Sequence, residues 1–570
     1  MKIALSQQNY RVGDFEGNTS LILDALEKAG LAGADLVVFP EMAVCGYPPR
    51  DFLEFADFTD RCRQVIDRIA IACKGIAAIV GAPSKNPGTK WKPLYNSAYF
   101  LADGEIRGIA HKTLLPNYDV FDEYRYFEPN RLPYQVVTFR GVRFALTICE
   151  DLWTVDYAPL YVRNPMDELA GLCPEVLVNI AASPFHYNQP ALRREVLVQT
   201  ARKYNLPVFY VNHAGAQTEL IFDGGSMVIA RDGALVGELA RFKEDFGLFD
   251  LESGRPGGQE VRRSGSQEAW RTGSSDPVSE TELIHDALVL GIRDYFRKMG
   301  FTKAILGLSG GVDSAVTAVL AVEALGNRNV HALLMPSRFS TDHSITDARE
   351  LAGNLGISCD IISIEDAFRT FEQILEPAFR GTEYGLAEEN IQARIRAVIL
   401  MAIANKSGYI LLNTSNKSEI AVGYGTLYGD LCGGLSVLGD VYKTQVYGLA
   451  RYINRLHGLI PKNTLEKPPS AELKAGQKDT DSLPEYELLD RILEAAIEQR
   501  KGPDDLTGMG FTPEVVKDVL RRVNTSEWKR QQAPRFSGCP QRHSERAAGC
   551  RLLQNTLRNS VDPAGGPAAT

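Results

Sequence analysis

The hexapeptide Ser309-Gly310-Gly311-Val312-Asp313-Ser314 decides the fold of the second half of this 570-residue chain. It follows the apolar run 304–308, which is typical of a buried strand, and it leads into the helix-favouring run 315–325. The pattern therefore predicts a strand, a glycine turn and a helix. The glycines let the backbone approach a ligand closely, and the free N–H groups at the helix start favour an anion. We expect phosphate at this turn.

The residues of the turn also limit its chemistry. A Walker A loop carries Gly-Lys-Ser/Thr, whereas this turn has no lysine and contains Asp313, a carboxylate suited to Mg²⁺. The turn resembles the loop of the ATP pyrophosphatases, which cleave ATP between its α- and β-phosphates and transfer AMP to a substrate oxygen. The resemblance implies adenylation rather than kinase chemistry. The structural alternative is an ordinary βα turn rich in serine and glycine.

Three ionisable residues mark the first half of the chain. Glu41 follows the apolar run 36–38, Lys112 comes next in sequence, and Cys149 ends the strand-like run 142–148. A cysteine nucleophile needs a base to take its proton and a nearby cation to favour the thiolate. Glu41 and Lys112 are candidates for these roles.

The same segments suggest how an intermediate is stabilised. Lys112 is also a candidate for oxyanion stabilisation, and Glu123 is a candidate to hold the lysine or relay a proton. A single cysteine after an apolar strand is more often part of a core. The prediction of a catalytic cysteine therefore depends on glutamate, lysine and cysteine occurring together in this order. Together the three contexts resemble the nitrilase (carbon–nitrogen hydrolase) superfamily.

Composition limits the class of protein. A hydrophobic content of 44% supports globular packing, and a formal net charge of -9 argues against a general nucleic-acid binder. The nine cysteines show no metal-ligand spacing, and the first residues read as a strand rather than a secretory signal. No apolar run is long enough to span a membrane. We therefore expect a cytoplasmic enzyme of small molecules, with no nucleic-acid or membrane partner.

The predicted organisation is two α/β domains. Residues 252–280 are rich in Gly, Ser, Arg and Pro and form a predicted linker between domains at 1–251 and 281–534. Strand-like runs are expected at 2–7, 35–39, 76–81, 97–101, 142–148, 175–180 and 207–211, and then at 304–308, 330–334, 359–364 and 409–412. The first set, with the nitrilase resemblance, implies an α-β-β-α sandwich. The second predicts a doubly wound parallel sheet, and a helix is expected over 283–298.

The acceptor of the adenylate is indicated by a series of segments in the second half. They are Glu388 to Arg396, Leu411 to Glu419, Tyr428-Gly429-Asp430, Gly439-Asp440, Lys443-Thr444 and Pro469 to Leu473. On a helix over 388–396, Asn390 shares a face with Arg394, and Gln392 shares a face with Arg396. The series resembles NAD⁺ synthetase, and with the nitrilase half in front the chain to about residue 534 resembles the glutamine-dependent NAD⁺ synthetase family.

That resemblance implies the reaction and a role for each matched residue. Glutamine, ATP and deamido-NAD⁺ are the implied substrates, Mg²⁺ is the implied metal, and a homo-oligomer is the implied assembly. The catalytic set is Glu41, Lys112 and Cys149. The glutamine-binding set is Tyr118, Ser183, Gln189 and Glu150, with Trp153 as a neighbour of the nucleophile. The ATP-binding set is Ser309, Gly310, Gly311, Val312, Asp313, Ser314, Thr414 and Lys443. The deamido-NAD⁺ set is Asn390, Glu419, Asp430 and Asp440, and the metal ligands are Asp313 and Glu419.

The chain departs from the family pattern at two places. Gln189 stands where related chains commonly have lysine. From residue 535 the sequence has no lysine and ends in a Pro-, Gly- and Ala-rich run, so we expect an atypical, disordered tail in place of the family's basic one.

Structural alternatives also remain for single residues. Asp430 could be a turn former, Asn390 a helix cap, and Arg394 and Arg396 solvated charges. A related amidotransferase that acts on a purine nucleotide or an aspartyl acceptor, and an inactive scaffold, are the competing functions.

Overall fold

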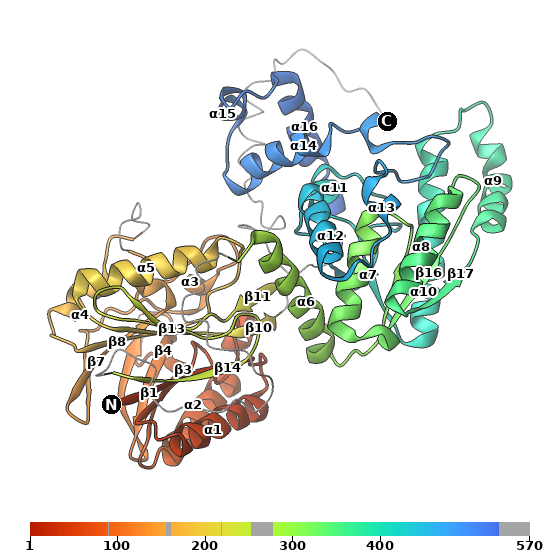
Figure 1. The fold of residues 1–570 in the computed structure, drawn as a ribbon. Helices are drawn as coiled ribbons and strands as arrows, with labels where there is room; N and C mark the ends of the chain where they lie inside the picture. The colour runs from red at the N-terminus through yellow and green to blue at the C-terminus, as the bar shows by residue number, and fades with distance from the viewer. Residues whose placement is uncertain (89–90, 155–160, 218, 252–277, 535–570) are drawn as a thin grey trace. The chain divides into compact units, whose positions relative to one another are not determined.

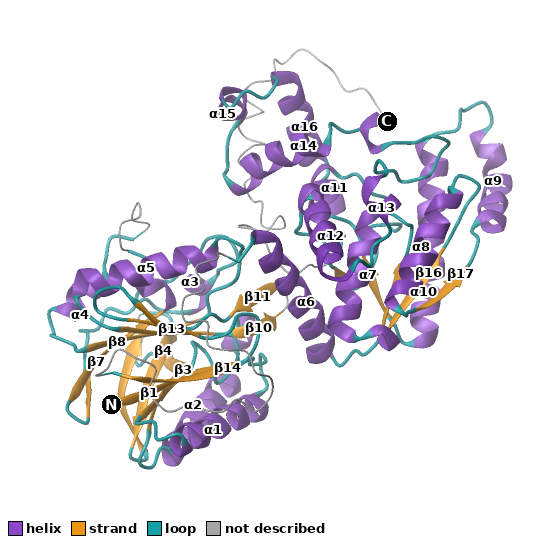
Figure 2. Cartoon of the chain, in the orientation of Figure 1, coloured by secondary structure: helices purple, strands orange, loops and turns teal. Residues whose placement is uncertain are grey.

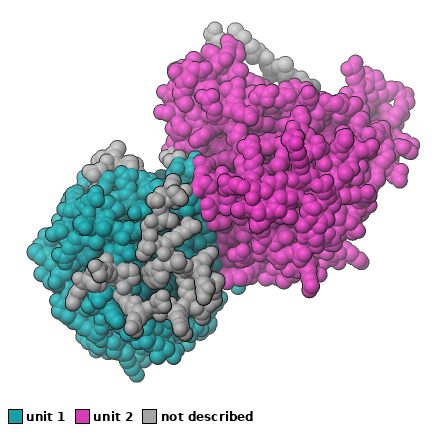
Figure 3. Space-filling view, viewed as in Figure 1, with its two compact units in different colours: residues 1–278 teal, residues 279–570 magenta. Residues whose placement is uncertain are grey.

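The computed structural model describes residues 1–88, 91–154, 161–217, 219–251 and 278–534. It divides the chain into two compact units, residues 1–278 and 279–570 (Figure 3). Most of the predicted linker (252–277) and the predicted tail (535–570) lie outside the described residues. Ser279 already caps helix α6 (Glu280–Met299), its side chain accepting a hydrogen bond from the Glu282 amide. Among the described residues, no helix combines the length and the apolar character needed to cross a bilayer.

The first unit contains two six-stranded sheets in its described part. The first has the order β14-β1-β2-β3-β4-β5 and the second β13-β12-β9-β8-β7-β6. The strands of the first sheet are β1 (Lys2–Gln7), β2 (Leu36–Val38), β3 (Ala77–Lys85), β4 (Leu94–Ala102), β5 (Glu105–His111) and β14 (Asp245–Asp250). Those of the second are β6 (Val137–Phe139), β7 (Val142–Ile148), β8 (Val176–Ala181), β9 (Val208–Asn212), β12 (Met227–Ile229) and β13 (Leu235–Glu238). A hairpin of β10 (Ala214–Gln217) and β11 (Leu220–Asp223) is separate.

The sheets pack face to face, with helices outside. Figure 1 shows α1 (Phe15–Leu31) and α2 (Ala56–Ala72) on one side, and α4 (Pro165–Ala170) and α5 (Gln189–Tyr204) on the other. Alternating side chains of β1 explain this arrangement, because Ile3 and Leu5 join the core between the sheets while Ala4 joins the core beneath α1 and α2. The predicted α-β-β-α sandwich is confirmed.

The strand predictions for this unit were incomplete. All seven predicted runs are strands; 2–7 and 142–148 have the predicted bounds, and the ends of the other five are shifted by one to four residues. The strands β5, β6 and β10 to β14 were missed. Several of these are short, and β5 alternates exposed and half-buried residues on an edge of the sheet, so its apolar signal is weak.

The second unit is built on a parallel sheet of order β17-β16-β15-β18-β19. Its strands are β15 (Ala304–Gly307), β16 (Val330–Leu334), β17 (Ser358–Ile361), β18 (Ile410–Asn413) and β19 (Leu435–Ser436). Its first helices are α6, α7 (Val312–Leu325), α8 (Asp342–Leu355), α9 (Glu365–Phe379), α10 (Leu386–Ser407), α11 (Lys417–Val422), α12 (Lys443–His457) and α13 (Lys462–Glu466). After these come α14 (Tyr486–Leu493), a π-helical turn η5 (Glu494–Glu498), α15 (Pro503–Gly508), α16 (Pro513–Thr525) and α17 (Glu527–Arg530).

The order of this sheet confirms the doubly wound prediction. The chain moves outward from β15 to β17 and then returns to β18 on the other side of β15, so the order reverses between β15 and β18. Leu400 and Ala404 of α10 pack on Ile305, Leu333 and Leu411, and Figure 2 shows further helices around the sheet. Ligands of such sheets bind at the carboxyl ends of the strands beside this reversal. The turn at 309–314 and the segment 414–416 lie there.

Candidate active sites

Glu41 lies in the turn after β2, and its backbone is held closely by β3. A Cβ atom added at Gly81 would lie 2.4 Å from the Met42 nitrogen and 2.6 Å from the Glu41 Cα. Only glycine therefore permits this approach without moving the turn. One oxygen of the Glu41 carboxylate accepts a hydrogen bond from the Ala182 amide at 2.8 Å.

Lys112 lies directly after β5 and joins two carboxylates. Its Nζ is 2.8 Å from Glu41 Oε1 and 2.8 Å from Glu123 Oε1, and all three side chains are buried. Burial lowers the pKa of Lys112, but Glu123 and Glu41 outweigh it, so this pKa is raised well above its usual value. Lys112 therefore stays charged. Burial, more than any other cause, raises the pKa of Glu123.

Two residues that the sequence did not reveal complete this cluster. Asn96 Nδ2 donates to Glu41 Oε1 at 2.5 Å and to Glu123 Oε2 at 3.4 Å, and the Tyr47 hydroxyl donates to Glu123 Oε1 at 2.8 Å. The available signal for Asn96 was an amide in the middle of the otherwise largely apolar, buried strand β4. Buried polar groups need partners, and here the partners are the two carboxylates.

Cys149 lies where β7 ends and a short 3-10 turn, η2 (Cys149–Leu152), begins. Its φ of 42° is in the left-handed region, which non-glycine residues adopt rarely and often at functional sites. Burial raises the pKa of the thiol well above its usual value, Glu41 raises it further and Lys112 lowers it. The resting thiol is therefore neutral, and a base must remove its proton when it attacks.

Asp151 connects the lysine segment to the cysteine segment. Its Oδ1 accepts hydrogen bonds from the Thr113 and Leu114 amides at 3.0 and 2.9 Å, and its Oδ2 accepts one from the Ile148 amide at 3.1 Å. Burial raises the pKa of Asp151 to about 7. Sequence reasoning missed this residue, although it stands two places after the nucleophile.

The predicted glutamine-binding residues form two hydrogen-bonded pairs. The Tyr118 hydroxyl donates to Glu150 Oε1 at 2.7 Å, and Gln189 Nε2 donates to Ser183 Oγ at 3.1 Å. Burial raises the pKa of Glu150. Trp153 is half-buried and ends the η2 turn that begins at Cys149.

In the second unit the turn after β15 has the predicted strand–turn–helix form. Gly310 has a φ of +79°, and an added Cβ would lie 2.4 Å from the Ser344 carbonyl oxygen. Ser309 Oγ lies 3.1 Å from Ser314 Oγ and accepts from the Gly311 amide at 3.2 Å. Val312 is the first residue of α7, so the turn presents the start of this helix.

Asp313 and Glu419, the predicted metal ligands, both contact Lys443. Lys443 Nζ is 2.5 Å from Asp313 Oδ2 and 3.3 Å from Glu419 Oε1. Asn416, which sequence reasoning did not assign, donates from Nδ2 to Asp313 Oδ1 at 2.8 Å and accepts from the Glu419 amide at 3.0 Å. Asn416 thus caps α11 and holds Asp313 at the same time. Its place between a strand end and a short helix was the available signal.

The electrostatics of this cluster suit a ligand that carries charge. Burial raises the pKa of Glu419 to about 8. Burial lowers the pKa of Lys443, but the charges of Asp313 and Glu419 outweigh it, so the pKa of Lys443 is raised. Within the described residues, no group of three or more His, Cys, Asp or Glu side chains is placed to hold a metal ion. Mg²⁺ is usually bound by one or two carboxylates together with phosphates and water. Asp313 and Glu419 fit that requirement.

The predicted dinucleotide residues lie in three places, and one of them, Glu419, belongs to the Lys443 cluster described above. The Thr426 hydroxyl donates to Asn390 Oδ1 at 2.7 Å, and the Thr426 amide donates to Asp430 Oδ1 at 2.7 Å, so these residues lie together. Asp440 is instead buried, with its carboxylate 2.9 Å from Lys417 Nζ.

The structure also places four residues for which the sequence left a role or an alternative open. Thr414 is half-buried after β18. Asn390 lies inside α10 rather than at its cap, and Arg394 and Arg396 donate to the Leu427 and Met335 carbonyls.

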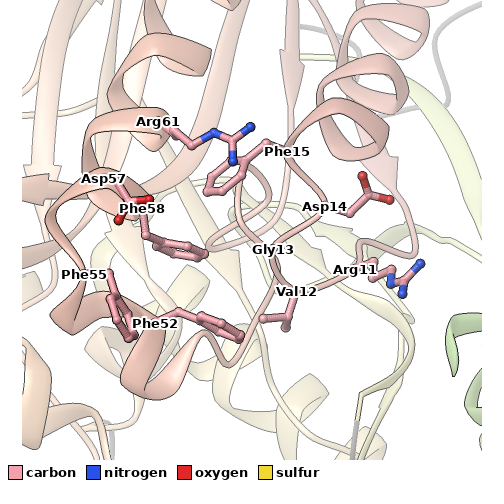
Figure 4. Close-up of a pocket in the computed structure, with 10 residues that line it drawn as sticks. All are labelled: Arg11, Val12, Gly13, Asp14, Phe15, Phe52, Phe55, Asp57, Phe58 and Arg61. Atoms are coloured by element: carbon pink, nitrogen blue, oxygen red, sulfur yellow. The ribbon is translucent and has the colours of Figure 1, made fainter.

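A surface pocket of the first unit has a different composition. Figure 4 shows its aromatic side chains, among which Phe52 and Phe58 stack at 5.5 Å. It is lined by Arg11, Val12, Gly13, Asp14, Phe15, Phe52, Phe55, Asp57, Phe58 and Arg61. None of the predicted site residues is among these.

Comparison with known proteins covers both units. A family model described as NAD synthase matches residues 284–533, and one described as carbon-nitrogen hydrolase matches residues 2–255. A glutamine-dependent NAD(+) synthetase of Synechocystis sp. is 44% identical over 540 residues, which cover 93% of this chain and 94% of the relative. The enzyme of the same name from Thermotoga maritima is 40% identical over 563 residues, covering 94% and 95%.

Solved structures agree. The glutamine-dependent NAD+ synthetase of Acinetobacter baumannii, in complex with adenosine diphosphate, is 35% identical with a TM-score of 0.75, covering 96% of this chain and 97% of that one. The Cytophaga hutchinsonii protein of that name, 21% identical with a TM-score of 0.79, shares the fold and covers 97% and 99%.

Proposed function

The chain belongs to the glutamine-dependent NAD(+) synthetase family, and on that premise we propose that its two units perform the two halves of one amidation with the residues described above. Glutamine is hydrolysed in the first unit. In the second unit ATP adenylates the nicotinate carboxylate of deamido-NAD⁺, and ammonia then displaces AMP. The products are NAD⁺, AMP, pyrophosphate and glutamate. The observation that supports this most strongly is that each unit holds a buried lysine between two carboxylates, Lys112 with Glu41 and Glu123 in the first and Lys443 with Asp313 and Glu419 in the second.

In the glutaminase half, Cys149 attacks the side-chain amide carbon of glutamine. Because the thiol is neutral at rest, Glu41 accepts its proton during the attack and delivers it to the departing ammonia. Lys112 supplies the positive charge for the oxyanion. Glu41 then activates the water that hydrolyses the thioester. Tyr118 with Glu150, and Ser183 with Gln189, form the two sides of the proposed glutamine site.

In the synthetase half, residues 309–314 and Thr414 bind ATP, and Lys443 neutralises phosphate charge. Asp313 and Glu419 would hold Mg²⁺, which neutralises charge on the leaving pyrophosphate when it is bound. Asn390 and Asp430, together with Glu419, contact deamido-NAD⁺. Because Asp440 is paired with buried Lys417, we propose that it supports this site rather than touching the dinucleotide. Assembly into a homo-oligomer is proposed on family membership alone, and analytical ultracentrifugation measures it.

The test is NAD⁺ formation from deamido-NAD⁺ and MgATP, with glutamine or ammonium as the nitrogen donor. Cys149→Ala should lose the glutamine reaction, by about 10⁴-fold or more, and keep the ammonium reaction. Cys173→Ala, which changes an exposed cysteine of the same unit, is the control and should keep both. If the wild type makes no NAD⁺ from either donor, the acceptor is wrong. If Cys149→Ala still uses glutamine, the nucleophile is wrong.

A further inference from the structure

Two carboxylates outside the proposed ATP site contact the starts of α11 and α12, two of the helices that carry its charged residues. Glu419 lies in the first turn of α11, and Lys443 is the first residue of α12. Helix α14 packs against both of these helices (Figure 1). Its Asp490, and Glu498 at the end of the adjoining η5 turn, are both buried.

Asp490 completes the N-terminus of α12. Its Oδ2 accepts a hydrogen bond from the Thr444 amide at 2.9 Å, and its Oδ1 accepts one from the Ser418 hydroxyl. The same hydroxyl oxygen accepts from the Lys443 amide at 2.9 Å. The first amides of a helix have no partner within the helix, and Tyr442 at the cap position makes no side-chain cap. Asp490 and Ser418 provide the missing acceptors.

Glu498 contacts the start of α11 through a side chain rather than through a backbone amide. Its Oε1 accepts hydrogen bonds from Lys417 Nζ and, at 3.1 Å, from the Tyr442 hydroxyl. Lys417 is the first residue of α11, and its amide donates to the Val441 carbonyl at 2.9 Å. Glu498 ends the only π-helical turn in the described part of the chain, and such turns are rare and often occur at functional sites.

We propose that Asp490 and Glu498 are positioning residues of the synthetase reaction, which fix Lys443 and Glu419 for MgATP by holding the N-termini of α12 and α11. This inference rests on the ATP site proposed above. Neither Asp490 nor Glu498 is among the residues proposed above to bind a substrate or the metal. Buried Lys417 is paired with two buried carboxylates, those of Asp440 and Glu498. Burying three charged groups costs free energy, and apolar residues of similar volume in their place are often as stable, so packing alone does not explain this cluster. The cluster lies at the start of α11, the helix whose first turn carries Glu419.

The test is steady-state kinetics of the ammonium reaction with MgATP varied. Glu498→Gln and Asp490→Asn should each raise the KM for MgATP about tenfold, as expected for one lost hydrogen bond to a charged group, with a smaller change in kcat. Glutamine hydrolysis in the absence of ATP should stay at the wild-type rate, because that site lies in the other unit. Glu487→Gln, an exposed carboxylate of the same helix, is the matched control and should change neither constant. Ser418→Ala removes the hydroxyl that joins Asp490 to the Lys443 amide without changing any charge, and it should also raise this KM about tenfold.

The outcomes separate this inference from the function on which it rests. If Glu498→Gln and Asp490→Asn lower the unfolding temperature but keep the KM for MgATP at the value of the control, the inference is overturned. These hydrogen bonds then stabilise the fold without positioning Lys443 and Glu419. If Glu498→Gln and Asp490→Asn do not fold, Ser418→Ala decides in the same way. A wild type that is inactive with ammonium overturns the proposed function itself.

Discussion

Gly81→Ala should separate the two half-reactions by displacing the turn that carries Glu41. The new Cβ would lie 2.4 Å from the Met42 nitrogen, and the turn must retreat by about 1 Å to restore an ordinary contact of 3.4 Å. The obstacle is backbone, so no side-chain rotation relieves it. A misplacement of about 1 Å in a catalytic group costs about 10²-fold in rate. We therefore expect glutamine hydrolysis to fall about 100-fold.

The assay is glutamate release in parallel with NAD⁺ formation from ammonium. The ammonium reaction should stay at the wild-type rate, which also shows that the second unit is folded. Gly30→Ala, in α1 with open space around the new atom, is the control and should leave both rates unchanged. Circular dichroism confirms that the variant is folded. Glutamate release within twofold of wild type would refute the argument that Gly81 positions the base.

Two further predictions concern the second unit. Gly310→Ala should reduce NAD⁺ formation from either donor about 100-fold and spare glutamine hydrolysis, because the new Cβ would lie 2.4 Å from the Ser344 carbonyl oxygen. The control is Gly326→Ala, which has a similar φ of +83° and open space around the new atom, and which should change stability alone. Equal NAD⁺ formation by the two variants would contradict this prediction. His285→Gln should make the unfolding temperature depend less on pH above neutrality. Burial lowers the pKa of His285, but Asp286 and Glu323 outweigh it and raise this pKa from 6.5 to about 9. In the wild type, the stabilisation from charged His285 is therefore complete below pH 6.5 and is lost as pH rises through about 9, by up to about 3 kcal/mol. If His285→Gln and the wild type show the same dependence of unfolding temperature on pH between pH 6 and 9.5, this histidine is not charged.

Local pattern was enough for much of the fold and for the reactive groups. A strand that ends in Gly310 and Gly311 and runs into a helix has few alternatives, because glycine alone adopts the required backbone at low cost. Glu41 and Cys149 were recognisable because each follows an apolar strand, where side chains emerge from the sheet. The edge strand β5 escaped because neither of its faces is fully buried, so hydrophobic alternation did not mark it.

What the sequence by itself determined was the order of elements and the identity of the groups that react; the partners of those groups were decided by tertiary structure. Asn96 and Glu41 are 55 positions apart, and Ser418 and Asp490 are 72 apart. Asp440 stands in the predicted dinucleotide-binding set, and its pairing with Lys417, 23 positions away, was found only in the folded chain. The physical reason is that backbone conformation responds to neighbours within a few residues, whereas a buried charge takes whichever partner the packing of strands and helices brings within hydrogen-bond distance.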